Sequence, residues 1–363
     1  MSAMGFRRGG AAALAVALLA ACSAEPPPSG PAASAGPPSP TASPQGSVAE
    51  APSPEPQPSE GPRSFDVDLF PVPPGSAPHD VAPAADGGVW YTAQGSGELG
   101  WLDPETGEVR EIPLGAGSAP HGVIVGPDGA PWITDGGLNA IVRVDPETDE
   151  VRAYALPAGL PSANLNTAAF DGDGVLWFTG QAGYYGSLDP VSGRMRVFDA
   201  PRGSGPYGIT ATPDGQIYFS SLAGSYLGAV ERRSGDVTVI EPPTAGAGLR
   251  RVWSDSRGRL WVSEWFAGAV GVYDPADRSW REWSLPRSGA QAYAVYVDET
   301  DAIWLTDFTT DAILRFDPDT EDFLSLKTED GMTANVRQLL GRDGEVWGAE
   351  SAADQLVVIR YSG

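Results

Sequence analysis

Short apolar runs alternate with polar and turn-forming residues along residues 64–363. In a run such as Ala140-Ile141-Val142-Arg143-Val144, which is five residues long, the pattern is typical of a β-strand that buries one face. Glycine-rich and Asp-Pro turns separate these runs, and tight turns between short strands favour antiparallel hairpins. The pattern therefore predicts an all-β region.

The turns and the residues after them repeat along the chain. A turn followed by an aromatic residue recurs every 41 to 45 residues, with Trp90, Trp132, Trp177, Tyr218, Trp261, Trp304 and Trp347 at the aromatic position. A second turn of the Asp-Pro type follows most of these aromatics, as in Asp103-Pro104 and Asp317-Pro318. Each repeat then holds four short antiparallel strands, and we expect its aromatic residue to pack within the sheet.

Seven such units predict an all-β, seven-bladed β-propeller over 64–363. The last repeat ends after its third strand, near Leu356 to Tyr361, and a spare strand at 66–71 resembles the fourth strand of a repeat. We expect the spare strand to complete the seventh blade, which leaves no sheet edge unpaired. An open array of sheets is the alternative.

Residues 1–63 have a different composition. Arg7 and Arg8 precede an apolar run that is too short to span a bilayer, and the run ends at Leu19-Ala20-Ala21-Cys22. This ending resembles the lipobox of bacterial lipoproteins, which implies a signal peptide over 1–21 and lipidation of Cys22. An ordinary cleaved signal is the alternative. Residues 22–63 are rich in Pro, Ser and Ala, and we interpret them as a disordered tether.

Composition and charge narrow the function classes. The 363 residues carry a net charge of −24, which argues against nucleic-acid binding and against attraction to an anionic membrane. Only 19% of the residues are charged, whereas 46 are Gly and 35 are Pro, which disfavours an all-helical fold. The single cysteine excludes an intrachain disulfide. We expect a monomer on the outer face of the cytoplasmic membrane, held only by its lipid anchor.

Hairpin symmetry predicts which residues face one another at one end of the innermost strands. Residues equidistant from a turn pair with each other, and the turn of the second repeat centres on Asp128. The same offset in every repeat predicts seven pairs around the axial channel: His79 with Ala93, His121 with Asp135, Asn166 with Gly180, Tyr207 with Ser221, Arg250 with Glu264, Tyr293 with Asp307, and Val336 with Glu350.

Several of these positions could carry chemistry. His79 and His121 are the only histidines and should lie on adjacent blades, where one neutral imidazole could act as a base and the other as an acid or ligand. Asp135, Asp307 and Glu350 could hold a hard cation, and Asn166, Tyr207, Arg250, Glu264, Tyr293 and Asp307 would line a ligand-binding rim. Simpler structural roles are also open: the histidines could bind backbone groups, and Arg250 could form a cross-strand ion pair with Glu264. Trp265 and Phe266 could line a pocket at the rim.

The segments 208–219 and 174–179 resemble the streptogramin B lyase (virginiamycin B lyase) family, and the resemblance extends over 64–363. It implies a seven-bladed propeller that opens a cyclic depsipeptide antibiotic by eliminating a C–O bond, with Mg²⁺ and a histidine base. The chain departs from the family at its catalytic positions, because Tyr293 and Val336 stand where family histidines lie and Ala334 stands where a metal-binding glutamate lies. Among the family's carboxylates, Glu350 persists.

Three function classes therefore stay open. The first is a metal-assisted C–O lyase, as the resemblance implies, with His79 and His121 as catalytic residues and Asp135 and Glu350 as Mg²⁺ ligands. The second is a non-catalytic propeller that binds a small molecule, an envelope component or a protein at the rim. The third is a lactonase-like hydrolase, to which Asn166, Asp135 and Glu350 could contribute.

Overall fold

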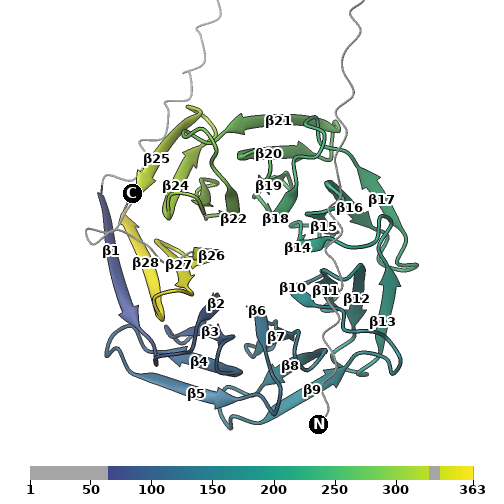
Figure 1. Cartoon of the computed structure of the whole chain (residues 1–363), viewed down its shortest axis with the longest axis vertical. Helices are drawn as coiled ribbons and strands as arrows, with labels where there is room; N and C mark the ends of the chain where they lie inside the picture. Colours follow the sequence, from purple (N-terminus) through teal and green to yellow (C-terminus); the bar gives the residue numbers. More distant parts are fainter. Residues whose placement is uncertain (1–63, 327–335, 363) are drawn as a thin grey trace, which may run out of the picture. The chain divides into compact units, whose positions relative to one another are not determined.

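The described residues of the chain, 64–326 and 336–362 in this computed structural model, form 28 strands. The strands make seven antiparallel sheets of four strands each, and the sheets stand around a common centre as the blades of a propeller (Figure 1). This arrangement confirms the predicted fold class. Among the residues described, no helix is long and apolar enough to span a membrane.

Each blade runs from an innermost strand to an outermost strand. Blades 1 and 2 contain β2 (Pro78–Pro83), β3 (Val89–Ala93), β4 (Glu98–Leu102), β5 (Val109–Pro113), β6 (Pro120–Val125), β7 (Pro131–Asp135), β8 (Ala140–Val144) and β9 (Val151–Ala155). Blades 3 and 4 contain β10 (Leu165–Phe170), β11 (Leu176–Gly180), β12 (Tyr184–Leu188), β13 (Met195–Asp199), β14 (Pro206–Ala211), β15 (Ile217–Ser221), β16 (Tyr226–Val230) and β17 (Val237–Ile240). Blades 5 and 6 contain β18 (Leu249–Ser254), β19 (Leu260–Glu264), β20 (Ala269–Asp274), β21 (Ser279–Ser284), β22 (Ala292–Val297), β23 (Ile303–Asp307), β24 (Ala312–Asp317) and β25 (Asp322–Leu326).

Blade 7 joins the two ends of the propeller. Its order is β1 (Ser64–Pro71), β28 (Gln355–Ser362), β27 (Glu345–Glu350) and β26 (Val336–Arg342), so the first strand is the outermost strand of the last sheet. All eight residues of β1 pair with β28, from Ser64 with Ser362 to Pro71 with Gln355. The predicted closure is confirmed, because backbone hydrogen bonds between β1 and β28 close the ring.

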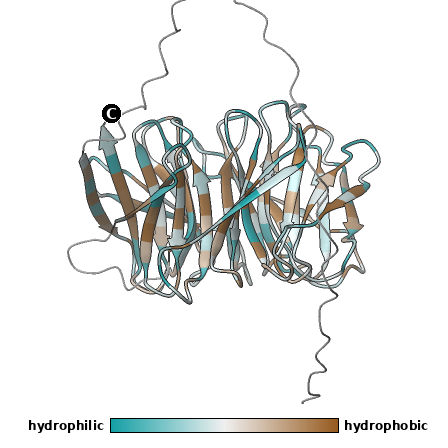
Figure 2. Cartoon of the chain, turned by 90° about the horizontal axis from the view of Figure 1, so that it is seen from above, coloured by the Kyte–Doolittle hydropathy of each residue, from teal (hydrophilic) through white to brown (hydrophobic). Residues whose placement is uncertain are grey.

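The core lies between neighbouring blades. The repeated aromatic residues are buried there: Trp177, for example, is 1% exposed and packs with Ile209 and Phe219 of the next blade. Several of these indoles also donate a hydrogen bond to the turn that precedes them, as Trp177 Nε1 does to Asp171 at 2.9 Å. The repeated tryptophans are therefore packing residues, as predicted. Figure 2 shows hydrophobic residues concentrated in the strands and hydrophilic residues in the loops at both ends.

The pairing of the two innermost strands differs from the prediction. The pairs at the end of these strands are Pro78 with Ala93, Pro120 with Asp135, Leu165 with Gly180, Pro206 with Ser221, Leu249 with Glu264, Ala292 with Asp307, and Val336 with Glu350. Six of the seven predicted pairs are thus wrong by one residue. The cause is a β-bulge directly after each pair, where the innermost strand holds an extra residue.

In blade 7 the predicted pair of Val336 with Glu350 is present, but a different residue from the predicted one occupies the polar ring. Its first turn is short, since Arg342 pairs with Glu345, whereas Pro83 pairs with Val89 in blade 1. Val336 consequently corresponds in space to Pro78, and the first residue of the bulge is Arg337. The prediction that Val336 occupies the polar ring is wrong, and Arg337 takes that place.

A hydroxyl group anchors six of the seven bulges. In blades 1 to 6 the second bulge residue donates its backbone N–H to a Thr or Ser of the facing strand, at 2.9 to 3.3 Å, and the acceptors are Thr92, Thr134, Thr179, Ser220, Ser263 and Thr306. The first five of these hydroxyls also donate to the carbonyl of the first bulge residue in the next blade. Between blades 7 and 1, Gln338 Oε1 instead accepts the N–H of Val81 at 3.0 Å. These side chains join neighbouring blades at the channel.

Replacing Thr134 by Val should destabilise the protein by about 1–3 kcal/mol, because it leaves the buried N–H of Gly122 and the carbonyl of Asn166 without their partner. Thr134→Ser keeps the hydroxyl and should lose much less. Urea unfolding followed by tryptophan fluorescence measures both. Equal stability of the Val and Ser variants would contradict a role of the hydroxyl in joining the blades.

Candidate functional site

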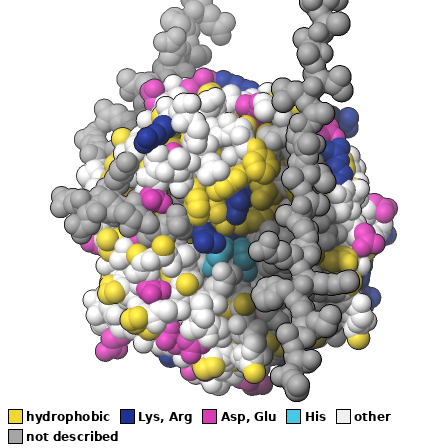
Figure 3. Space-filling model, viewed as in Figure 1, with side chains coloured by type: hydrophobic (Ala, Val, Ile, Leu, Met, Phe, Trp, Pro, Cys, Tyr) yellow, Lys and Arg dark blue, Asp and Glu magenta, His cyan; other side chains and the backbone are white. Residues whose placement is uncertain are grey.

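The first residue of each bulge contributes to a polar ring at the channel, which we call the axial ring. Its members are His79, His121, Asn166, Tyr207, Arg250, Tyr293 and Arg337. Several contacts join blades that are not neighbours, such as the 2.7 Å bond between the hydroxyls of Tyr207 in blade 4 and Tyr293 in blade 6. Such contacts show that the side chains meet inside the channel. Figure 3 shows histidine surface near the centre of one face, beside basic and hydrophobic side chains.

The two histidines lie together, as predicted. Their ring centroids are 3.8 Å apart, and the side chains of His79 and His121 are buried. Each bonds a side chain and not a backbone group: His79 Nδ1 lies 2.7 Å from Asp80 Oδ1, and His121 Nε2 lies 3.2 Å from Asn166 Nδ2. Because the carboxylate accepts, neutral His79 carries its proton on Nδ1. Because the Asn166 amide nitrogen donates, neutral His121 carries its proton on Nδ1.

Both imidazoles favour the neutral form. Burial lowers the pKa of His79 well below its usual value, and the positive charges of Arg251, Arg337 and Arg250 lower it further. Burial likewise lowers the pKa of His121, followed by the effect of His79. At neutral pH the site therefore holds two uncharged imidazoles, and His79 Nε2 is an acceptor.

Asp80 and Arg251 form an ion pair across the channel. The guanidinium of Arg251 in blade 5 donates to Asp80 Oδ1 at 2.9 Å and to Oδ2 at 3.2 Å, and both side chains are almost fully buried. Arg251 also donates to the hydroxyl of Thr167 at 3.3 Å. The pair fixes Asp80 against His79 and compensates both buried charges.

Arg250 lies among aromatic rings. Its guanidinium carbon is 3.5 Å from the ring centroid of Tyr293, 4.4 Å from that of Tyr207 and 4.6 Å from that of Trp265. It also donates to the Tyr207 hydroxyl at 2.8 Å. Trp265 packs on Phe308 as well, at 5.5 Å between centroids. Tyr207 and Tyr293 are buried in this aromatic wall, whereas Trp265 is partly exposed. The contacts place Trp265, but not the exposed Phe266, at the rim as the sequence suggested.

Asp135 and Asp307 point into loops and not into the channel. Asp135 Oδ1 accepts the N–H groups of Ala119 and Leu138, and Oδ2 accepts the Ser118 hydroxyl at 2.5 Å. Asp307 caps its own loop in the same way, through Gln291, Thr309 and Thr310. The predicted pairing of His121 with Asp135 is wrong, because the bulge turns the histidine toward the axis while the carboxylate stays in the loop.

Glu264 and Glu350 are also turned away from the axial ring. Glu264 is fully buried within blade 5, where a side chain at Gly271 would lie 2.5 Å from its Oε1. Among the described residues neither of its carboxylate oxygens has a hydrogen-bond partner, so Arg250 and Glu264 do not pair. Burial, and after it Glu282, raises the pKa of Glu264 to about 8. Glu350 is buried too; its Oε2 accepts from Gln355, and burial raises its pKa.

The donor set does not fit the Mg²⁺ ion that the family resemblance implies. Mg²⁺ requires several oxygen ligands in octahedral geometry. Of the three groups that lie within 4.8 Å of one another, two are imidazoles, and both oxygens of the third, Asp80, accept from His79 or Arg251. Three guanidinium groups also make the site positive enough to lower the pKa of His79. Asp135 has both oxygens occupied, which leaves Glu350 as a lone carboxylate.

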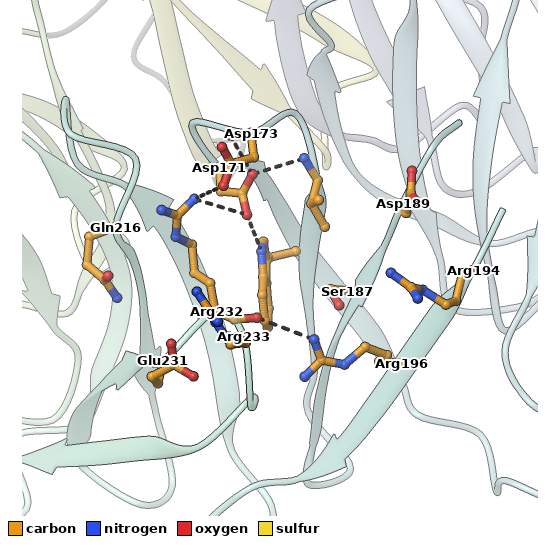
Figure 4. Close-up of a pocket in the computed structure, with 12 residues that line it drawn as sticks. Asp171, Asp173, Ser187, Asp189, Arg194, Arg196, Gln216, Glu231, Arg232 and Arg233 are labelled. Atoms are coloured by element: carbon orange, nitrogen blue, oxygen red, sulfur yellow. Dashed lines mark hydrogen bonds and ion pairs between the residues drawn. The ribbon is translucent and has the colours of Figure 1, made fainter. Parts of the chain in front are cut away.

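A polar cleft of about 490 Å³ lies between blades 3 and 4 and is lined by residues of both blades (Figure 4). Two of its arginines have partners within the cleft: Arg232 bonds Asp173 at 2.9 Å and lies 3.6 Å from Asp171, and Arg196 donates to the carbonyl of Arg232. This internal pairing leaves the axial ring as the stronger candidate.

A sequence profile of the Virginiamycin B lyase family matches residues 35–290 and 204–363. The chain belongs to the Virginiamycin B lyase family. A search of curated protein sequences gave no match.

Several solved structures share the fold. A streptogramin B lyase superposes with a TM-score of 0.75 at 24% identity, over 84% of this chain and 100% of the other. Virginiamycin B lyase from Staphylococcus aureus gives 0.75 at 20% identity, over 82% and 99%. The extracellular domain of a one-component system from B. thetaiotaomicron gives 0.66 at 15% identity, over 83% of this chain and 40% of the other.

Sequence reasoning missed Asp80, Thr167, Arg251 and Arg337. Hairpin symmetry assigns one channel residue to each repeat, whereas the bulge turns a second residue toward the site. A polar residue directly after the ring position was the available signal in blades 1, 3 and 5, as in His79-Asp80, Asn166-Thr167 and Arg250-Arg251.

The lowered pKa values predict that both histidines are much less protonated at pH 5.5 than an unperturbed histidine, which is about nine-tenths protonated there. ¹⁵N NMR of the two imidazoles measures this directly, and both protons should reside on Nδ1. An imidazole that titrates near pH 6.5 would contradict the buried, positively biased site.

The same shifts make the free energy of unfolding depend on pH. The unfolded chain binds protons at a pKa near 6.5, before the folded protein does, so this contribution is complete above that pH and declines as the pH falls below it. Between pH 6.5 and 5 the wild type should lose more stability than a double His79→Asn, His121→Asn variant.

Proposed function

We propose that the axial ring is an acid–base site for a small molecule and that it breaks a C–O bond by elimination. The observation that carries this proposal is the buried pair of Asp80 and His79, stacked on a second neutral imidazole and surrounded by guanidinium groups. Membership in the Virginiamycin B lyase family supports the reaction class.

His79 acts as the base. Its Nδ1–H is held by Asp80, which leaves Nε2 to remove a proton from the carbon beside a carbonyl group of the ligand. The electron pair of that C–H bond forms a C=C bond, and the C–O bond at the next carbon breaks with its electron pair moving to oxygen. Asp80 stabilises the imidazolium that forms, and Arg251 keeps the carboxylate in place.

His121 supplies a proton to the leaving oxygen. The Asn166 amide donates to His121 Nε2, so the proton lies on Nδ1, a buried atom without a partner among the described residues. Transfer of this proton balances the one that His79 takes up, and neither water nor an oxidant is consumed. The proton returns from His79 to His121 before the next turnover, over a ring-to-ring distance of 3.8 Å.

A solved relative supports a catalytic role for histidine in this family. A catalytically inactive His-to-Ala variant of virginiamycin B lyase from Staphylococcus aureus was solved with quinupristin, so a histidine carries activity in that protein. In this chain the histidines come from blades 1 and 2, whereas Tyr293 and Arg337 fill the ring in blades 6 and 7. We infer that the site is displaced around the ring and that its substrate differs.

Binding without chemistry is the second candidate. The cross-channel links between Asp80 and Arg251 and between Tyr207 and Tyr293 hold the ring rigidly, which suits recognition as well as catalysis. A hydrolase of the lactonase type is the third outcome, and the mass of the product separates it from a lyase.

We would incubate the protein with quinupristin, and separately with an oligogalacturonate, and analyse the products by liquid chromatography and mass spectrometry. Elimination gives products whose masses add up to that of the substrate, whereas hydrolysis adds one water. His79→Asn should lower the elimination rate at least 100-fold, and EDTA should leave it unchanged, because the donor set does not fit Mg²⁺. The exposed Arg257→Gln serves as the matched control.

Ligand binding without turnover of either compound would overturn the lyase proposal in favour of a binding propeller. A rate that survives His79→Asn would place the base elsewhere.

We further propose that the protein is exported and anchored by a lipid at Cys22, with residues 22–63 as the tether. The lipobox-like ending Leu19-Ala20-Ala21-Cys22 supports this proposal, and it lies outside the described residues. Wild-type protein expressed in a bacterial host should sediment with membranes, and Cys22→Ala should release it or stop its processing. Equal membrane association of both forms would contradict the anchor.

A further inference from the structure

We propose that the ligand of the axial ring carries a carboxylate and that Arg250 binds it. The inference rests on the proposed function and deepens it: the carbonyl group beside the proton that His79 removes would be a carboxylate, as in a β-alkoxy sugar acid, and not a neutral ester.

The charge balance of the site points to an anion. The chain as a whole carries −24, yet Arg250, Arg251 and Arg337 all act on His79 as positive charges. Asp80 is the carboxylate that faces them, and Arg251 already pairs with both of its oxygens. Within the described part of the site, two guanidinium charges therefore exceed the carboxylates available.

Arg250 is the better placed of these two cations. It is half-buried, it forms no ion pair with a carboxylate of the described residues, and its hydrogen bond goes to the neutral hydroxyl of Tyr207. Burial raises the pKa of Tyr207, so this hydroxyl does not supply a negative charge. A guanidinium withdrawn from water without an anion is costly, and a bound carboxylate would remove that cost.

The aromatic side chains fix the direction of this guanidinium. Tyr207, Tyr293 and Trp265 surround it at 3.5 to 4.6 Å, so its planar group is oriented before any ligand arrives. Its Nε is buried and has no partner among the residues described. A planar carboxylate matches the fork of an arginine in two parallel hydrogen bonds, which a spherical anion cannot do.

Binding of a carboxylate by Arg250 would also make a Mg²⁺ ion unnecessary at this site, whose described residues do not fit that ion. Removing a proton beside a carboxylate places a second negative charge on its oxygens, and a cation must stabilise that charge for the elimination to proceed. Arg250 is fixed in the same ring as the His79 base, on the bulge that also carries Arg251. The arginine thus supplies the electrostatic stabilisation that a metal ion would give.

Acetate and acetamide test the inference, because they have nearly the same shape and differ in charge. We would titrate each into ¹⁵N-histidine-labelled protein at pH 7.5 and constant ionic strength, and follow the two imidazole signals. Acetate should shift the signals saturably, with acetamide at least fivefold weaker. Arg250→Gln should weaken acetate binding at least tenfold, Arg250→Lys less so, and the exposed Arg257→Gln not at all.

An equal response to acetate and acetamide, no saturable response to either, or an unchanged affinity in Arg250→Gln would each overturn the inference. The wild-type comparison holds even if a variant fails to fold.

The experiments distinguish a failure of the anion site from a failure of the proposed lyase function. His79→Asn should keep acetate binding, read on the His121 signal, while it loses elimination. Acetate binding without turnover would support the anion site and contradict the lyase proposal. Turnover of quinupristin without a response to acetate would support the lyase proposal and contradict the anion site. Where an oligogalacturonate is cleaved, its methyl ester should react at least tenfold more slowly.

Discussion

The bulge at the start of each innermost strand is the constraint on which the rest of the structure depends. In six blades it places one extra residue opposite a Thr or Ser, and the hydroxyl of that residue accepts the backbone N–H that the bulge leaves unpaired. In five blades the same hydroxyl donates a hydrogen bond to a backbone carbonyl of the next blade. Gly122 shows how tight this joint is, because a side chain there would lie 2.6 Å from the carbonyl of Asn166. In blades 1, 3 and 5 the bulge that joins neighbouring blades also brings two consecutive polar side chains to the candidate site, so one structural device serves both.

The charges at the site depend on the second bulge residues of blades 1 and 5, Asp80 and Arg251. With one residue from each repeat the channel would hold two histidines and two arginines, all without a carboxylate. The second bulge residues add Asp80 and Arg251, whose ion pair orients His79 and leaves Arg250 among aromatic rings. Burial and the guanidinium charges then keep both imidazoles neutral, which is the state that proton transfer near pH 7 requires.

Within the Virginiamycin B lyase family the chain keeps the scaffold and changes the ring. Seven equivalent positions around one axis allow a catalytic pair to lie on any two adjacent blades, because each blade presents its first bulge residue in the same way. A histidine pair on blades 1 and 2 lies in the same ring as arginines on blades 5 and 7, so neutral imidazoles and guanidinium groups meet at one site.

The sequence by itself determined the number of blades, the packing of the repeated tryptophans and the closure by 66–71, since each follows from a local period that is written into neighbouring residues. It also brought His79 and His121 together, because equal positions in adjacent repeats must be neighbours. Only the tertiary structure decided which groups those histidines meet. Arg251 and Asp80 are 171 residues apart and join across the channel, and a short turn moves Arg337 into the place expected for Val336. Bulges and turn lengths shift a side chain from one face of a strand to the other without changing the repeat, so no periodicity reveals them.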